Sequence, residues 1–81
     1  MNARSWDAIM KDIKYTAIYA KTKTGYSAHI PDLPGCIATG RTLELTKRRM
    51  REAVALHLRG MREDGEPIPQ PTTQADVIEA A

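Results

Sequence analysis

The stretch that most constrains the fold runs from Tyr26 to Gly40, where two short apolar segments flank a turn rich in proline and glycine. Pro34 presets φ at the first central position of a turn, and Gly35 accepts the positive φ that a type II turn requires next. Pro31 has no backbone N–H to give to a neighbouring strand, so it fits the place where a strand stops. The stretch therefore predicts two strands that meet at a rigid corner, with the second strand ending at Gly40.

The chain before this corner adds one more strand and a short helix to the prediction. Residues 14–20 have the alternating composition of a strand, and the polar segment 21–25 ends on a glycine, which predicts a hairpin to the strand at 26–30. A third strand at 36–40 follows the corner. Three strands with such short connections predict an antiparallel meander. Apolar residues at helical spacing predict a short helix within residues 1–13.

The longest helical pattern follows the third strand. Thr42 is a good N-cap, and Gly65 is placed to end the helix, which we expect to span residues 43–64, in the left-handed conformation. Alternating prolines then predict an extended segment, and residues 76–79 are candidates for a short last strand. The apolar stripe that should face the sheet consists of Leu43, Thr46, Met50, Ala53, Val54, His57 and Met61.

These elements predict one α+β domain over residues 1–81, in which three antiparallel strands pack on one long helix. The short helix at 1–13 precedes a core at 14–64, and a proline-rich segment at 65–81 follows it. A chain of 81 residues lies near the lower size for a self-sufficient core, so we expect a homodimer or higher homo-oligomer. A single cysteine suits a reducing compartment, and no apolar run approaches the roughly 18 residues of a membrane span, so we expect a cytoplasmic protein.

No group of residues has the pattern of a catalytic or metal site. The chain has no glycine-rich phosphate loop and no serine in a nucleophile elbow, and Asp32 stands almost alone as a carboxylate near the predicted sheet. His29, His57 and Cys36 contain no short-spaced ligand pair; we interpret His57 as a core histidine and Cys36 as a small apolar residue. We therefore expect no enzymatic activity, no cofactor and no metal.

The outer face of the long helix is the candidate interaction face. Arg48, Arg51 and Arg59 lie opposite the apolar stripe, where they form either a solvated surface or a contact for nucleic-acid phosphates. Leu45 and Leu56 lie on the flank of the same helix and favour contact with a protein. The net charge of the chain is only +2, which neither requires nor excludes an anionic partner.

Several of these motifs together resemble the HicB family of antitoxins. The resemblance rests on Gly-Tyr-Ser-Ala at 25–28, Ile-Pro-Asp-Leu-Pro-Gly-Cys at 30–36, Gly-Arg-Thr at 40–42, and the glycine and alternating prolines after the helix. It covers about Tyr15 to Pro71 and implies a partial RNase H-like domain. The motif positions that we interpret as structural determinants are Tyr26, Pro31, Pro34, Gly35, Gly40, Thr42 and Gly65.

The resemblance implies binding rather than catalysis. HicB-like proteins pair with a small HicA-type toxin, which cleaves RNA, and cover its active site. Many also carry a C-terminal DNA-binding module; because the sequence ends at Ala81, we expect this chain to lack one. A basic toxin would meet the arginines of the helix with like charge. Either the toxin docks elsewhere, for example along a sheet edge, or the chain is an orphan HicB-like domain with another partner.

Overall fold

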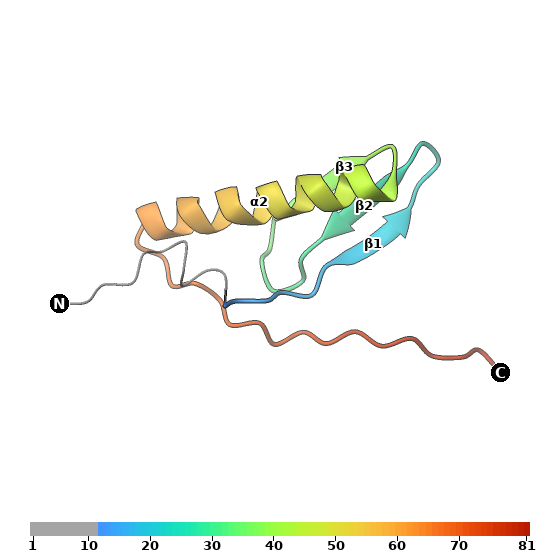
Figure 1. Ribbon diagram of the computed structural model, residues 1–81. Coiled ribbons are helices and arrows are strands. Elements are labelled where there is room, and N and C mark those ends of the chain that lie inside the picture. The colour runs from blue at the N-terminus through green and yellow to red at the C-terminus, as the bar shows by residue number, and fades with distance from the viewer. Residues whose placement is uncertain (1–11) are drawn as a thin grey trace.

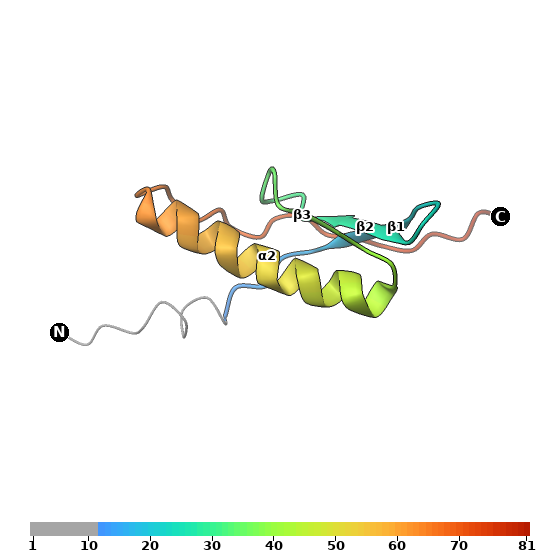
Figure 2. The same cartoon turned by 90° about the horizontal axis from the view of Figure 1, so that it is seen from above.

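The computed structural model describes residues 12–81, and Figure 1 shows them as a small sheet beside one long helix. The strands form one antiparallel sheet in the order β1-β2-β3, and the helix covers one of its faces (Figure 2). This arrangement confirms the predicted α+β class. The helix predicted within residues 1–13 lies almost entirely outside the described residues. The elements are β1 at Ile18–Lys21, β2 at Tyr26–His29, β3 at Ile37–Gly40 and α2 at Leu43–Glu63.

The first strand is shorter than predicted, because β1 begins at Ile18 rather than at residue 14. Its register explains the difference: Ile18 pairs with His29, so residues before Ile18 would have to pair with the turn that begins beyond β2. Pro31 in that turn has no N–H with which to continue a ladder. Tyr15 and Ala17 still pack against the core, as their alternation predicted.

The β1–β2 hairpin closes as predicted. The N–H of Thr22 donates to the carbonyl of Gly25 at 2.8 Å, and Lys21 pairs with Tyr26 at the first position of β2. The Lys21 ammonium also lies 5.8 Å from the centre of the Tyr26 ring, within cation–π range. Tyr26 pairs with Gly40 on its other side, so it ties both neighbouring strands together at this end of the sheet.

Two consecutive β-turns connect β2 to β3. The N–H of Leu33 donates to the carbonyl of Ile30, and the N–H of Cys36 donates to the carbonyl of Leu33, both at 3.0 Å. Gly35 has φ of +85°, which matches the third position of a type II turn and confirms the prediction for Pro34 and Gly35. Leu33 has no exposed surface, so this double turn is part of the core.

The start of α2 is fixed by Thr42 and by a close approach of β3. The Thr42 hydroxyl oxygen accepts from the N–H of Leu45 at 3.1 Å, which confirms Thr42 as the N-cap. Thr46 is fully buried, and its hydroxyl donates to the Thr42 carbonyl at 2.7 Å. A Cβ at Gly40 would lie 2.7 Å from the Thr46 hydroxyl oxygen, so a side chain there would push β3 away from the helix.

The end of α2 has the hydrogen bonds of a Schellman motif. Gly65 has φ of +72°, its N–H donates to the carbonyl of Arg62 at 3.1 Å, and the N–H of Glu66 donates to that of Met61 at 2.8 Å. The helix ends at Glu63, one residue earlier than predicted, and Gly65 ends it in the left-handed conformation as predicted.

The core lies between the sheet and α2. Leu58 is 3% exposed although the predicted stripe omitted it, while Thr46 and Met50 are buried as the stripe predicted. Partly buried Met61 and Ile68 extend the cluster toward the end of the helix. Among residues 12–81, the buried apolar residues are Ala28, Ile30, Leu33, Cys36, Met50 and Leu58.

The segment after α2 is extended, and it contains no strand. The proposed last strand at 76–79 is therefore wrong: residues 64–81 have no ladder hydrogen bonds to the sheet. Val77 and Ile78 are 93% and 78% exposed, and the hydrogen bonds that tie this segment to Asp32 come from Thr72 and Thr73. In Figure 1 the final residues run past β1 and away from the body of the domain.

The conformations of Gly35 in the turn and Gly60 in α2 predict opposite changes in stability when each is replaced by alanine. We expect Gly35→Ala to lower the free energy of unfolding by about 1 kcal/mol, because alanine is strained where φ is positive. Gly60→Ala should raise it by roughly 0.5–1 kcal/mol, because alanine favours a helix interior and the added Cβ meets nothing within 4 Å. Urea unfolding followed by circular dichroism measures both; equal effects of the two substitutions would contradict the turn assignment.

Candidate functional site

The outer face of α2 carries the predicted cations in exposed positions. Arg48, Arg51 and Arg59 are all exposed, and the first and last are eleven positions apart, or about 16 Å along the helix axis. Lys47 is exposed beside them. These side chains offer positive charge to a partner.

The two leucines predicted on the flank of α2 differ in their surroundings. Leu56 is 67% exposed, whereas Leu45 is partly buried beside the end of β3. A Cβ at Gly40 would lie 3.3 Å from Leu45 Cγ, so Leu45 packs at the junction between β3 and α2. Leu56 therefore offers an apolar side chain to a partner, while Leu45 contributes mainly to the fold.

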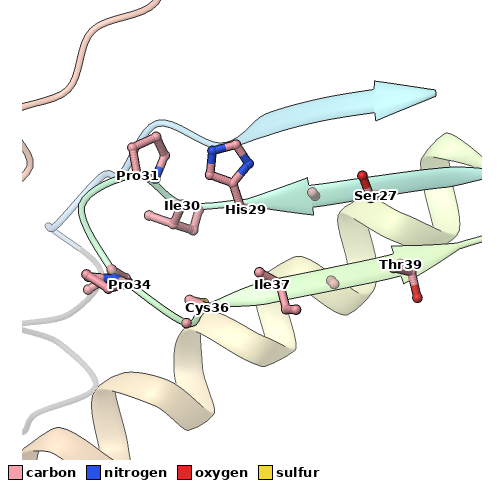
Figure 3. A pocket seen from close by; sticks show the side chains of 12 residues that line it. Ser27, His29, Ile30, Pro31, Pro34, Cys36, Ile37 and Thr39 are labelled. Carbon is pink, nitrogen blue, oxygen red and sulfur yellow. The ribbon is translucent and has the colours of Figure 1, made fainter. Parts of the chain in front are cut away.

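An uncharged groove follows the β2–β3 hairpin and was not predicted (Figure 3). Its volume is about 530 Å³, and none of the side chains that line it is an acid, a lysine or an arginine. Ile37 is 66% exposed here, and His29 is exposed on the neighbouring strand. The outward position of His29 follows from strand alternation; the exposure of Ile37 does not, because an isoleucine in a strand usually faces a core. Labelled side chains of the groove include Ser27, His29, Pro31, Pro34, Ile37 and Thr39.

Asp32 is the centre of a hydrogen-bonded clamp on the C-terminal segment. Its Oδ2 accepts from the N–H groups of Thr72 and Thr73, both at 3.0 Å, and its Oδ1 accepts from their hydroxyls at 3.0 and 2.8 Å. The Thr16 hydroxyl donates to the Thr73 carbonyl at 2.8 Å, and the Tyr15 hydroxyl donates to the Pro69 carbonyl at 2.6 Å. Asp32 therefore has a structural role, because it holds the C-terminal segment against the domain.

The hydrogen bonds and charges of the clamp shift the pKa values of Asp32 and Tyr15. The backbone N–H of Thr73 is the largest cause of a lowered pKa at Asp32, followed by the Thr73 hydroxyl; partial desolvation opposes them, and the bonds from Thr72 add to the lowering. Burial, with a smaller contribution from the charge of Asp32, raises the pKa of Tyr15, whose hydroxyl stays protonated and donates to Pro69. The ionised form of Asp32 is the one that holds the C-terminal segment.

Cys36 and His57 have structural surroundings. Burial raises the pKa of the Cys36 thiol, so the thiolate needed for nucleophilic attack is disfavoured. His57 is partly buried on the sheet side of α2, in the apolar stripe where it was predicted, while His29 lies exposed on β2. Within residues 12–81, no three His, Cys, Asp or Glu side chains lie together in a way that could hold a metal ion.

The comparison with protein families identifies the family. The description "HicB_like antitoxin of bacterial toxin-antitoxin system" belongs to the family model that matches residues 15–81. The chain belongs to this HicB-like antitoxin family. This membership confirms the resemblance seen in the motifs around the double turn, and it supports an antitoxin role.

This HicB-like chain is similar in sequence to three curated relatives. An uncharacterized 14.9 kDa protein of Haemophilus phage HP1 is 38% identical over 56 residues, which are 69% of this chain and 42% of the phage protein. A UPF0150 protein of Thermoplasma acidophilum is 29% identical over 84% of this chain and 100% of its own length. A UPF0150 protein of Helicobacter pylori is 35% identical over 59% of this chain and 67% of its own. The chain thus spans less than half the length of the phage relative.

A solved structure shares the fold of this HicB-like chain. A chain from the HicA3 and HicB3 toxin-antitoxin complex superposes with a TM-score of 0.65 at 30% sequence identity. The match covers 74% of this chain and 70% of that chain. Separately, none of the helices in the described part of the chain is long and apolar enough to cross a membrane.

The clamp predicts an acid-sensitive C-terminal segment. Because the folded-state pKa of Asp32 is lowered, the stabilisation is complete above the ordinary aspartate pKa of about 3.9 and is lost as pH falls through the lower folded-state value. We expect the Thr72 and Thr73 amide resonances to move to unfolded positions as pH falls from about 5 to about 2.

Substitution of the clamp tests the same contact at neutral pH. Asp32→Ala should raise amide exchange at Thr72 and Thr73 to the rate of unprotected amides. Asp76→Ala is the matched control, because Asp76 accepts only from the adjacent N–H of Val77 and should leave both threonines unchanged. Protection of Thr72 and Thr73 that survives Asp32→Ala would show that the clamp does not hold the segment.

Proposed function

We propose that this chain is a non-enzymatic, cytoplasmic antitoxin that binds a small HicA-type toxin and covers its RNA-cleaving site. The observation that carries the proposal is the similarity to a chain of the HicA3 and HicB3 complex, at a TM-score of 0.65 and 30% identity. Family membership over residues 15–81 supports the same role.

The surroundings of Asp32 and Cys36 favour an antitoxin that inhibits the toxin by covering its active site. The Asp32 carboxylate is engaged by four hydrogen bonds, and the Cys36 thiol is buried and protonated. The exposed surface includes a basic helix face and the uncharged β2–β3 groove. An antitoxin of this kind acts by burying the toxin's active site in a stoichiometric complex, for which a standard interface needs about 800 Å² from each partner.

Charge indicates where the toxin does not bind. A toxin that binds RNA is expected to be basic, and it would be repelled by Arg48, Arg51 and Arg59 on the outer face of α2. We therefore place the toxin away from that face.

Co-expression with the toxin encoded beside this chain tests the proposal. We expect the chain to restore growth to cells that express the toxin, and to co-purify with it through washes at low and high salt. Leu33→Asp, which places a charge at a fully buried position, is the unfolded control and should restore nothing. Growth arrest unchanged by the folded chain, with no complex recovered, would contradict the proposal.

The exposed arginines favour a second candidate function, contact with nucleic-acid phosphates. Three guanidinium groups on one helix face can each neutralise a phosphate, and such binding weakens steeply as salt rises.

The double variant Arg48→Glu and Arg51→Glu separates the two candidates. For an antitoxin we expect toxin binding to be unchanged or stronger, because repulsion from a basic partner is removed. For a nucleic-acid-binding module we expect retention on RNA or DNA at about physiological salt, and its loss in the variant. Filter binding and toxin pull-down on the same preparations give both results, and toxin binding abolished by the double variant would contradict our placement of the toxin.

A further inference from the structure

We propose that the β2–β3 groove binds a nucleotide, with the base against Ile37 and His29 and the phosphate at Arg41 and Arg49, just beyond one end of the groove. The proposal concerns an anionic ligand of this chain, and it is independent of whether the chain binds a toxin. It rests on a second pocket that adjoins the groove, on the charges around that pocket and on the distance between the two.

The second pocket, which we call the basic pocket, lies where the β1–β2 hairpin meets the end of β3. Its volume is about 450 Å³. Two of the residues that line it carry guanidinium groups, four carry hydroxyls, and none carries a carboxylate. A guanidinium presents a planar fork of N–H donors that matches two phosphate oxygens, and hydroxyls can donate to the remaining oxygen. The lining residues are Thr22, Thr24, Tyr26, Thr39, Gly40, Arg41 and Arg49.

The walls of the basic pocket are held in place by the fold. The Arg49 guanidinium donates to the Thr39 carbonyl at 3.0 Å, which fixes this side chain beside β3 and leaves its other N–H groups for a ligand. A Cβ at Gly25 would overlap the Gly40 carbonyl, so the hairpin lies directly against the end of β3. Because these groups are already ordered, less conformational entropy is lost when an anion binds between them.

Charge selects an anion as the ligand of the basic pocket. From residue 13 to residue 43 the only acidic side chain is Asp32, and its carboxylate is engaged by four hydrogen bonds from the C-terminal segment. Lys21 and Lys23 add two exposed cations in the hairpin. Lys21 lies over the ring of Tyr26, which lines the pocket. Together with the two arginines, these lysines give this end of the sheet a positive potential that attracts a phosphate.

The uncharged groove adjoins the basic pocket and suits the rest of a nucleotide. Thr39 lines both spaces, and Figure 3 shows it at one end of the groove. His29 and Ile37 come from neighbouring strands and are both exposed in the groove, where an imidazole can stack on a base and an isoleucine can pack against it. Ile37 and Arg41 are four positions apart, or about 13 Å along an extended strand, a separation that a nucleotide can span from base to phosphate.

Amide chemical shifts recorded during titration with adenosine 5′-monophosphate, adenosine and inorganic phosphate test the site. We expect the monophosphate to shift the amides of Thr24, Arg41 and Ile37 with a dissociation constant of about 1 mM. Inorganic phosphate should shift Thr24 and Arg41 but not Ile37. Adenosine should bind about tenfold more weakly than the monophosphate, because it lacks the charged group that the guanidiniums hold. Amides of the groove and the basic pocket that do not respond to about 10 mM monophosphate would overturn the proposal.

Two charge-removing variants separate a built site from general attraction to a basic chain. Arg41→Gln should raise the dissociation constant of the monophosphate about tenfold, because one contact between guanidinium and phosphate is lost. Lys14→Gln is the control: it removes the same charge from an exposed residue that lines neither the groove nor the basic pocket. Circular dichroism confirms that both variants fold. Equal weakening by the two variants would overturn the proposal.

A third variant tests where the base lies. Ile37→Ala should weaken binding of the monophosphate about threefold and leave the binding of inorganic phosphate unchanged, because only the contact with the base is lost. Monophosphate binding unaffected by Ile37→Ala would overturn the placement of the base in the groove.

A short oligoadenylate in the same titration distinguishes the two sources of such a phosphate. Binding about tenfold tighter than that of the monophosphate, and weakened by Arg41→Gln, would identify the ligand as a nucleotide within a nucleic acid. Equal or weaker binding would identify it as a free nucleotide.

Discussion

The burial of Leu33 in the double turn between β2 and β3 is the contact on which the rest of the domain depends. Leu33 is fully buried between sheet and helix, and the turns on either side of it are closed by hydrogen bonds to Ile30 and Cys36. Asp32, the preceding residue, holds Thr72 and Thr73 of the C-terminal segment. One short turn thus fixes three parts of the chain, because a loop residue contributes to the core while its neighbour binds the segment after the helix.

The sequence was sufficient to predict those features of the fold that depend on neighbouring residues alone. Gly35, Thr42 and Gly65 act through their own φ or through bonds to residues within one turn, so their roles could be predicted. The start of β1 depends on what lies across the sheet, and the Asp32 clamp joins residues 40 and 41 positions apart. Hydrophobic periodicity and turn propensity cannot predict contacts between residues so far apart in the sequence. The exposed arginines were predicted from helical spacing, but the uncharged groove was not.

In a domain this small, some potentially reactive side chains are used to hold the fold together, and a partner must contact other surfaces. Asp32 is committed to hydrogen bonding and Cys36 to packing in the core. A partner can contact the uncharged β2–β3 groove and the positive charge of α2. The antitoxin role that we propose needs only such surfaces, because covering an active site requires complementarity rather than catalysis.

Titration of a purified HicA-type toxin with this chain, with cleavage of RNA as the readout, tests the central claim most directly. The account predicts that cleavage falls linearly to zero at a fixed ratio of chain to toxin, that RNA is left intact by the chain alone, and that the end point is unchanged at high salt. Cleavage that continues at full rate in excess folded chain would contradict the account, as would inhibition that disappears when salt releases the chain from RNA.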